Sequence, residues 1–197
     1  SLGNSTSGEV KAFGKDLVKD RTAVKAMIGL VPQEFNFNMF EKPIDIVSNQ
    51  AGYYGVPRKI ALERTEKYLK QLQLWDKKDT NSRGLSGGMK RRLMIARAMV
   101  NEPRILILDE PTSALGVRQT SNVLATIDLV RKQGIGVVFI THNVRHSMAV
   151  GDRFTVLNRG KTLGTALKGG ITPEELQDLM AGGQELASLE GSLGGTV

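Results

Sequence analysis

The stretch "ILILDEP", residues 105–111, places two acids directly after four apolar residues. A short continuous apolar run is typical of a strand inside a parallel sheet. The run ends at Asp109 and Glu110, and ligands of open α/β sheets bind at the carboxyl ends of strands. A carboxylate there can hold Mg²⁺ through water, and a second one can orient or deprotonate a water. The alternative is that Asp109 only caps a turn.

The sequence after this strand alternates between helical and strand patterns. Residues 117–132 predict a helix, and "IGVVFITH" at 135–142 and "RFTVLN" at 153–158 predict strands, with a turn at Arg159-Gly160. A final helix is expected over 173–180. Apolar strands that alternate with amphipathic helices indicate an α/β fold whose mostly parallel sheet is covered by helices. The inward face of the 117–132 helix is expected to carry Val123, Leu124, Ile127 and Val130.

The sequence before the strand carries "RGLSGGMKRR", residues 83–92. Ser86 is a suitable N-cap for a helix that ends near residues 101–103, and glycines at a helix start let the backbone approach an anion. Lys90, Arg91 and Arg92 either add charge to such a site or face water. The alternative is a glycine-rich start to an ordinary amphipathic helix. The helix before this segment is expected to bury Leu62, Thr65, Leu69 and Leu72.

Two further polar residues follow predicted strands. His142 comes after "VVFI" and could contact a phosphate oxygen or a water at the carboxyl edge. Gln33 ends the strand-like run "AMIGLVPQ", and its amide oxygen could reach a metal. Taken singly, His142 fits a structural role and Gln33 fits a surface loop.

The composition restricts the classes of protein. The chain has 197 residues, a formal net charge of +7 and no cysteine, which excludes disulfides and thiolate metal sites. A positive charge fits an anionic partner or a solvated basic surface. The longest apolar runs are far too short to span a bilayer, and the N-terminal residues lack a signal-peptide pattern.

In their order along the chain, these segments resemble the nucleotide-binding domain of ABC-type ATPases. The resemblance covers roughly residues 8–165. It implies a P-loop-NTPase-like (RecA-like) fold with an α-helical signature subdomain over residues 41–100. The expected organisation is one truncated domain over residues 1–197, with residues 183–197 as a flexible tail.

The resemblance also assigns roles. Gln33 corresponds to the Q-loop glutamine, Asp109 to the Walker B aspartate, Glu110 to the catalytic glutamate and His142 to the switch histidine. Asp109 and Gln33 are thus expected at the metal. The signature is Leu85, Ser86, Gly87, Gly88 and Met89, with Met89 where glutamine is usual.

The partners implied by the family are Mg²⁺ with ATP, a second ATP-binding domain and membrane-spanning transporter subunits. Two domains pair head to tail, so that each signature helix closes over the γ-phosphate held by the other domain's P-loop. The expected location is cytoplasmic, peripheral to the inner face of the membrane.

The P-loop pattern Gly-x-x-x-x-Gly-Lys-Ser/Thr does not occur in the sequence. Gly14-Lys15 is followed by Asp16, and the motif ending at Thr162 would need glycine where Thr155 stands. The P-loop strand and helix are therefore expected to be missing, which would leave a gap in the family's sheet. Residues 154–158 are predicted to close against residues 137–140. The alternatives are a strand from another chain or a marginally stable fold.

Two halves of the chain resemble different branches of the family. Up to about residue 104 the sequence looks like exporter-type ATPases, and from "PTSALGVRQ" onward it looks like sugar-importer ATPases. Gly116 stands where the family usually has aspartate, which puts communication between paired sites in doubt. A recombined or engineered chain, a chimera, is the hypothesis that this mixture suggests.

Three functions remain open on the sequence alone. The first is an ABC-type ATPase that powers transport and takes its P-loop from elsewhere. The second is a catalytically inactive, truncated or chimeric module that pairs with other ABC domains. The third is an ABC protein acting on RNA or ribosomes. It ranks last, because no aromatic–basic alternation typical of RNA-binding platforms is present.

Overall fold

The computed structural model describes residues 7–182 and divides the chain into two compact units, Ser1–Val138 and Phe139–Val197. The prediction of one domain over residues 1–197 stays a prediction. The predicted tail, residues 183–197, lies outside the described residues.

A parallel sheet organises the first unit. Strand β3 (Ile28–Val31) pairs in parallel with β4 (Ile105–Asp109), with Val31 opposite Leu108. The strand order is β3–β4–β5, so β4 is central, and Leu106 and Leu108 have no exposed surface. The parallel sheet predicted from the apolar run at 105–108 is therefore confirmed.

Strand β5 (Gly136–Ile140) differs from its prediction as a buried strand. Its exposed and partly buried positions alternate, and the side chains of Val138 and Ile140 are 41% and 48% exposed. The prediction was wrong because it used the composition of the strand alone, and an apolar composition does not establish that the strand is covered. Burial also requires a neighbour on each side, and β5 is the last strand of its described sheet.

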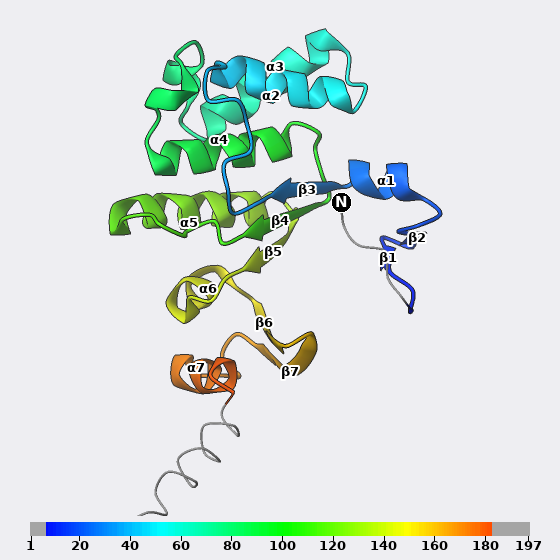
Figure 1. Ribbon diagram of the computed structural model, residues 1–197, viewed down its shortest axis with the longest axis vertical. Coiled ribbons are helices and arrows are strands. Elements are labelled where there is room, and N and C mark those ends of the chain that lie inside the picture. Colours follow the sequence, from blue (N-terminus) through cyan, green and yellow to red (C-terminus); the bar gives the residue numbers. More distant parts are fainter. Residues whose placement is uncertain (1–6, 183–197) are drawn as a thin grey trace, which may run out of the picture. The chain divides into compact units, whose positions relative to one another are not determined.

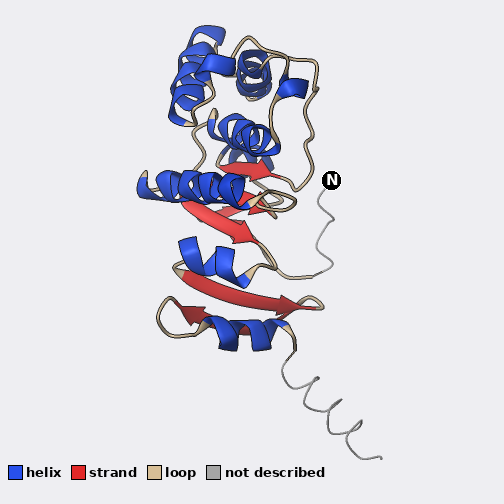
Figure 2. Ribbon diagram, turned by 90° about the vertical axis from the view of Figure 1, so that its left-hand side faces the viewer, coloured by secondary structure: helices blue, strands red, loops and turns tan. Residues whose placement is uncertain are grey.

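Between β3 and β4 the chain forms three helices. They are α2 (Pro43–Tyr53), α3 (Arg58–Gln71) and α4 (Gly87–Met99), with the short 3₁₀ turns η1 (Trp75–Lys77) and η2 (Ser82–Gly84) between α3 and α4. Figures 1 and 2 show α4 next to the sheet, with α2 and α3 on its other side. All of these helices lie within residues 41–100, the range predicted for the signature subdomain.

The buried face of α3 is close to the predicted one. Thr65, Leu69 and Leu72 are buried, but Leu62 is 37% exposed. Ala61 and Tyr68 complete the buried face instead. Leu62 was misplaced because leucine outweighs alanine in a hydrophobic pattern, whereas a close helix–helix contact favours the smaller residue.

The N-terminal part of the first unit is a small hairpin followed by helix α1 (Arg21–Ala26). Strand β1 (Lys11–Ala12) pairs antiparallel with β2 (Lys15–Asp16). Phe13 and Gly14 both have positive φ, 53° and 78°. That conformation is typical of the two-residue turns that close hairpins.

Helix α5 (Val117–Lys132) has the bounds that the sequence predicts. Val123, Ile127 and Val130 are buried as expected, and Leu124 is only partly buried. Among residues 7–182, no helix is both long enough and apolar enough to cross a membrane.

The second unit contains α6 (Val144–Val150), β6 (Arg153–Asn158), β7 (Lys161–Leu167) and α7 (Pro173–Met180). Its core is built from Phe154, Val156 and Leu176. Arg159 and Gly160, with φ of 47° and 78°, form the predicted turn between the two strands.

The predicted closure of residues 154–158 against residues 137–140 is wrong. In the described residues β6 pairs antiparallel with β7, in a sheet of its own. The physical reason is local, because a two-residue turn brings β7 against β6 with little loss of loop entropy. β6 thereby finds its strand partner in β7 and not in the larger sheet.

Candidate functional site

The ends of β3 and β4 bring three predicted site residues to one edge of the sheet. Val31 and Leu108 lie opposite each other in the parallel register, so Gln33 and Glu110 each come two residues after this pair. Asp109 is the last residue of β4. The carboxyl ends of adjacent parallel strands meet at the same edge, which is where ligands bind in open α/β sheets.

The backbone after β4 turns sharply. Glu110 and Ala114 have φ of 42° and 57°, which is unusual for residues with a side chain. The Ser113 N–H donates to the Glu110 carbonyl at 3.0 Å and closes the turn between them. Backbone in such sparsely populated conformations is concentrated at functional sites.

The signature segment forms the first turn of α4. Ser86 is the N-cap, and its hydroxyl accepts a hydrogen bond from the Met89 N–H at 3.3 Å, as the sequence predicts. Leu85 is 6% exposed and anchors the segment in the unit's interior. The N-terminal N–H groups of α4 and the helix dipole favour an anion at this end.

The two signature glycines also serve packing. A Cβ on Gly87 would lie 3.1 Å from Leu115 Cδ2, and one on Gly88 would lie 3.2 Å from Gln119 Cβ. The glycines therefore let α4 approach the loop after β4 and the first turn of α5. These contacts could not be predicted from the sequence, which indicated either an approach to an anion or a glycine-rich start to an ordinary helix.

Arg91 turns inward, which corrects the alternative in which the basic residues after the signature face water. It is 2% exposed, and its guanidinium donates to Pro32 O and Gln33 O at 2.7 Å each. The guanidinium carbon lies 5.1 Å from the centre of the Phe35 ring. Burial lowers the pKa of Arg91, and the charge of Asp109 opposes that shift.

A hollow of about 380 Å³ joins these parts within the first unit. Its lining includes Gln33, Phe35, Gly87, Arg91, Ser113 and Leu115. It thus brings together the loop after β3, the start of α4 and the loop after Glu110. This hollow, with the adjacent Asp109 and Glu110, is the candidate site.

His142 lies in the second unit, two residues after the end of β5 and just before Asn143, which caps α6. Its side chain is exposed, and the Asn143 side chain accepts a hydrogen bond from the His146 N–H at 3.0 Å. The expected meeting of His142 with Asp109 and Glu110 stays a prediction.

The predicted metal ligands are a carboxylate and an amide. Asp109 and Gln33 follow adjacent parallel strands, and oxygen ligands at such an edge fit Mg²⁺, which keeps much of its hydration. Residues 7–182 hold no cluster of three or more histidine, aspartate or glutamate side chains suited to a metal ion.

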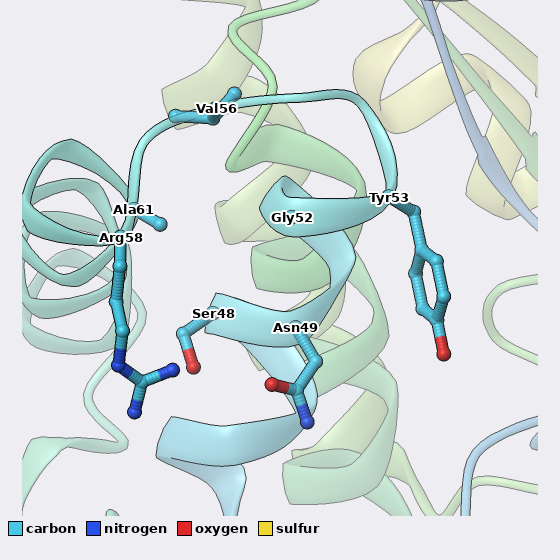
Figure 3. A pocket seen from close by; sticks show the side chains of 7 residues that line it. All are labelled: Ser48, Asn49, Gly52, Tyr53, Val56, Arg58 and Ala61. Carbon is cyan, nitrogen blue, oxygen red and sulfur yellow. The ribbon is translucent and has the colours of Figure 1, made fainter.

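A second hollow of about 380 Å³ lies between the end of α2 and the start of α3. Figure 3 shows its polar side chains, Ser48, Asn49 and Arg58, below the loop that joins the two helices. None of the predicted site residues lines it.

The sequence analysis did not predict that Arg91 binds the loop after β3, nor that Phe35 lies against its guanidinium. One signal was available, because the predicted α4 carries apolar residues around most of its circumference. Leu93, Met94, Ile95 and Met99 are all at most 1% exposed. A polar side chain within such a helix is itself buried and needs internal partners.

The sequence of this chain is similar to those of known proteins. The family description "ABC transporter" matches residues 1–113. The methionine import ATP-binding protein MetN of Carboxydothermus hydrogenoformans is 34% identical over 163 residues, which are 80% of this chain and 48% of that protein. The spermidine/putrescine import ATP-binding protein PotA of Treponema pallidum is 45% identical over 102 residues, 51% of this chain and 27% of that protein.

A solved structure supports the same relationship. It is described as an inward-facing conformation of a metal-chelate type ABC transporter. It superposes with a TM-score of 0.71 at 28% identity, covering 79% of this chain and 64% of that one. This likeness confirms the predicted P-loop-NTPase-like α/β fold. The chain spans about half or less of the length of the first curated relatives it matches.

Proposed function

This chain belongs to the ABC transporter family of ATP-binding proteins, and we propose from that premise that it supplies the signature half of an ATP site shared with a second ATP-binding domain. One observation carries the proposal. The first turn of α4, Gln33 and the loop after Glu110 line a single hollow at the carboxyl edge of the sheet.

The residues of the signature segment have the task of closing over a triphosphate. The N-terminal N–H groups of α4 favour an anion, and the Ser86 hydroxyl lies at the same end. In the family pattern the triphosphate is held by the P-loop of the paired domain.

The acids at the end of β4 would take part in hydrolysis only if a P-loop holds Mg-ATP next to them. Asp109 and Gln33 would hold Mg²⁺ through oxygen ligands, and bound Mg-ATP supplies the phosphoryl group to be transferred. Glu110 would orient the attacking water and take its proton. His142 would contact a phosphate oxygen, a role carried over from the family pattern.

The biological task that we propose is transport powered by ATP. The relatives named above are import ATP-binding proteins, and the proposed partners are membrane-spanning subunits that choose the solute. The chain would then act on the cytoplasmic side, peripheral to the membrane.

Trans-complementation tests the shared site. The chain is mixed with an ABC domain that carries a P-loop but whose own signature serine is substituted, and ATP hydrolysis is measured. We expect this chain to restore hydrolysis. The Ser86→Asp variant should not, because an aspartate caps the helix equally well but repels the phosphates.

Two further variants make the result specific. Ser86→Asn introduces a side chain of the same size as Ser86→Asp and also caps the helix, but it carries no charge. It should retain a clear share of the restored hydrolysis. Glu110→Gln should leave the restored hydrolysis unchanged, because the partner's own acids serve the partner's P-loop. Absence of any restored hydrolysis by the unsubstituted chain would overturn the proposal.

A complete ATP site within this chain would give a different result. Titration of the chain alone with a fluorescent ATP analogue and Mg²⁺ would show binding in the micromolar range. That binding would disappear in Asp109→Asn but persist in Asp178→Asn, a matched change on the exposed face of α7. We expect no such binding.

A further inference from the structure

Helix α4 holds the loop after β3 through two arginines. Arg91 donates one hydrogen bond to Pro32 O and one to Gln33 O, both at 2.7 Å. Arg97, two turns further along the helix, donates to Asn36 O at 3.1 Å and to the Asn36 side-chain oxygen. The two bonds from Arg91 therefore hold the carbonyl groups of two successive peptide units, which lie on either side of the Gln33 Cα.

We propose that Arg91 is a positioning residue for Gln33, which keeps the Q-loop glutamine in a fixed place relative to the signature turn of the same chain. Arg91 acts through the main chain, because its bonds go to carbonyl oxygens and leave the exposed Gln33 side chain available. The role in catalysis rests on the proposed function, whereas the anchoring itself does not.

The chemistry of the contact requires arginine. A planar guanidinium presents several N–H groups in a rigid fork and can reach two carbonyl oxygens at once, whereas a lysine ammonium is a point charge on a flexible stem. The centre of the Phe35 ring lies 5.1 Å from the guanidinium carbon, so the ring adds a cation–π contact to the two hydrogen bonds.

The burial of Arg91 favours a positioning role over a stabilising one. A buried charge is costly even when paired, and a well-packed apolar residue of similar size is often as stable. Within the described residues the Nε of Arg91 has no hydrogen-bond partner, so the site does not satisfy the whole guanidinium. What the arginine adds is a fixed geometry among the loop, the helix and Asp109, whose charge acts on it.

The neighbouring Arg92 provides a matched control. It lies on the same helix and also donates to a main-chain carbonyl, Leu72 O at 2.9 Å, and to the Gln73 side chain at 3.3 Å. Arg92 therefore anchors the end of α3, whereas Arg91 anchors the Q-loop. Substituting lysine at either position retains the charge and removes the fork.

The experiment uses the fact that the chain has no cysteine. A Gln33→Cys substitution gives a single attachment point for a nitroxide spin label, whose spectrum reports motion on the nanosecond timescale. Arg91→Lys in this background should raise the mobility of the label, and Arg92→Lys should leave it unchanged. Amide exchange at residues 34–36 should accelerate about tenfold or more in Arg91→Lys only, because charged hydrogen bonds to the loop are lost.

The outcomes separate the two proposals. If Arg91→Lys lowers global stability, Arg91→Gln is measured instead, at a temperature at which the α4 amides remain protected. The same rise in label mobility and in amide exchange is then expected. Equal label mobility and equal exchange in the Arg91 and Arg92 variants would overturn the anchoring. Neither measurement uses nucleotide, so a failed trans-complementation would overturn the proposed function while leaving this result intact.

Discussion

Gly29 lies where β3 passes closest to α4, and the structure leaves no room there for a side chain. A Cβ at this position would lie 3.0 Å from Ala98 O and 3.0 Å from Leu106 Cδ1. The main-chain oxygen cannot move without disturbing the end of α4. We expect Gly29→Ala to lower the free energy of unfolding by about 1–3 kcal/mol, measured by urea denaturation.

Gly52→Ala is the control for this change. Gly52 lies within α2, and a Cβ there would have no atom within 4 Å. The alanine should raise the free energy of unfolding by up to about 1 kcal/mol, because alanine favours a helix more than glycine does. If Gly29→Ala were as stable as Gly52→Ala, the close approach of β3 to α4 would be incorrect.

At the scale of the element, α4 depends on its N-cap. The Ser86 hydroxyl satisfies the Met89 N–H, one of the N–H groups that the first turn of a helix leaves without a partner. We expect Ser86→Ala to cost about 1 kcal/mol. The loss should appear as faster amide exchange at Met89, with residues at the far end of α4 unchanged.

Helix α7 in the second unit has a cap that responds to pH. The Thr172 N–H donates to Glu175 Oε2 at 2.8 Å, and the Glu175 N–H donates to Thr172 Oγ1 at 3.2 Å. These bonds hold the pKa of Glu175 below its ordinary value of 4.5. Because the folded-state pKa is depressed, the stabilisation is present above the unfolded-state pKa and is lost as pH falls through the folded-state value.

A titration below pH 4.5 tests this cap. The NMR shift of the Glu175 carboxyl should titrate below that value, and the α7 amides should lose protection over the same range. Glu175→Gln should remove this pH dependence of α7, whereas Glu174→Gln, one residue earlier, should retain it. Equal titration behaviour of α7 in both variants would contradict the capping box.

For the whole molecule, the division into two compact units predicts separate local stabilities. A Cβ on Gly151 would lie 2.7 Å from Phe154 Cε1 and 2.9 Å from Ser147 O, so Gly151→Ala strains the core of the second unit. We expect amide protection to fall within residues 139–182 in Gly151→Ala and within residues 7–138 in Gly29→Ala. Loss of protection in both ranges from either variant would support the single domain that the sequence predicted.

Helix bounds could be predicted closely where local signals agree. The bounds of α5 and α7 match the sequence because an apolar period of 3.6 coincides with caps and with a proline at the start of α7. Ser86 was identified as an N-cap for the same reason. The misplacement of Leu62 shows the limit, because choosing between two adjacent faces of α3 required knowing what packs against it.

The sequence by itself determined the order of the motifs, the family and the acids at the end of β4, since these depend on residue types at short, fixed spacings. Tertiary structure alone decided that Arg91 points into the interior, that β6 pairs with β7, and that the signature glycines admit Leu115 and Gln119. Each of these depends on contacts between residues distant in sequence or on competition between alternative partners. Such outcomes are set by the packing of whole elements, which local patterns do not encode.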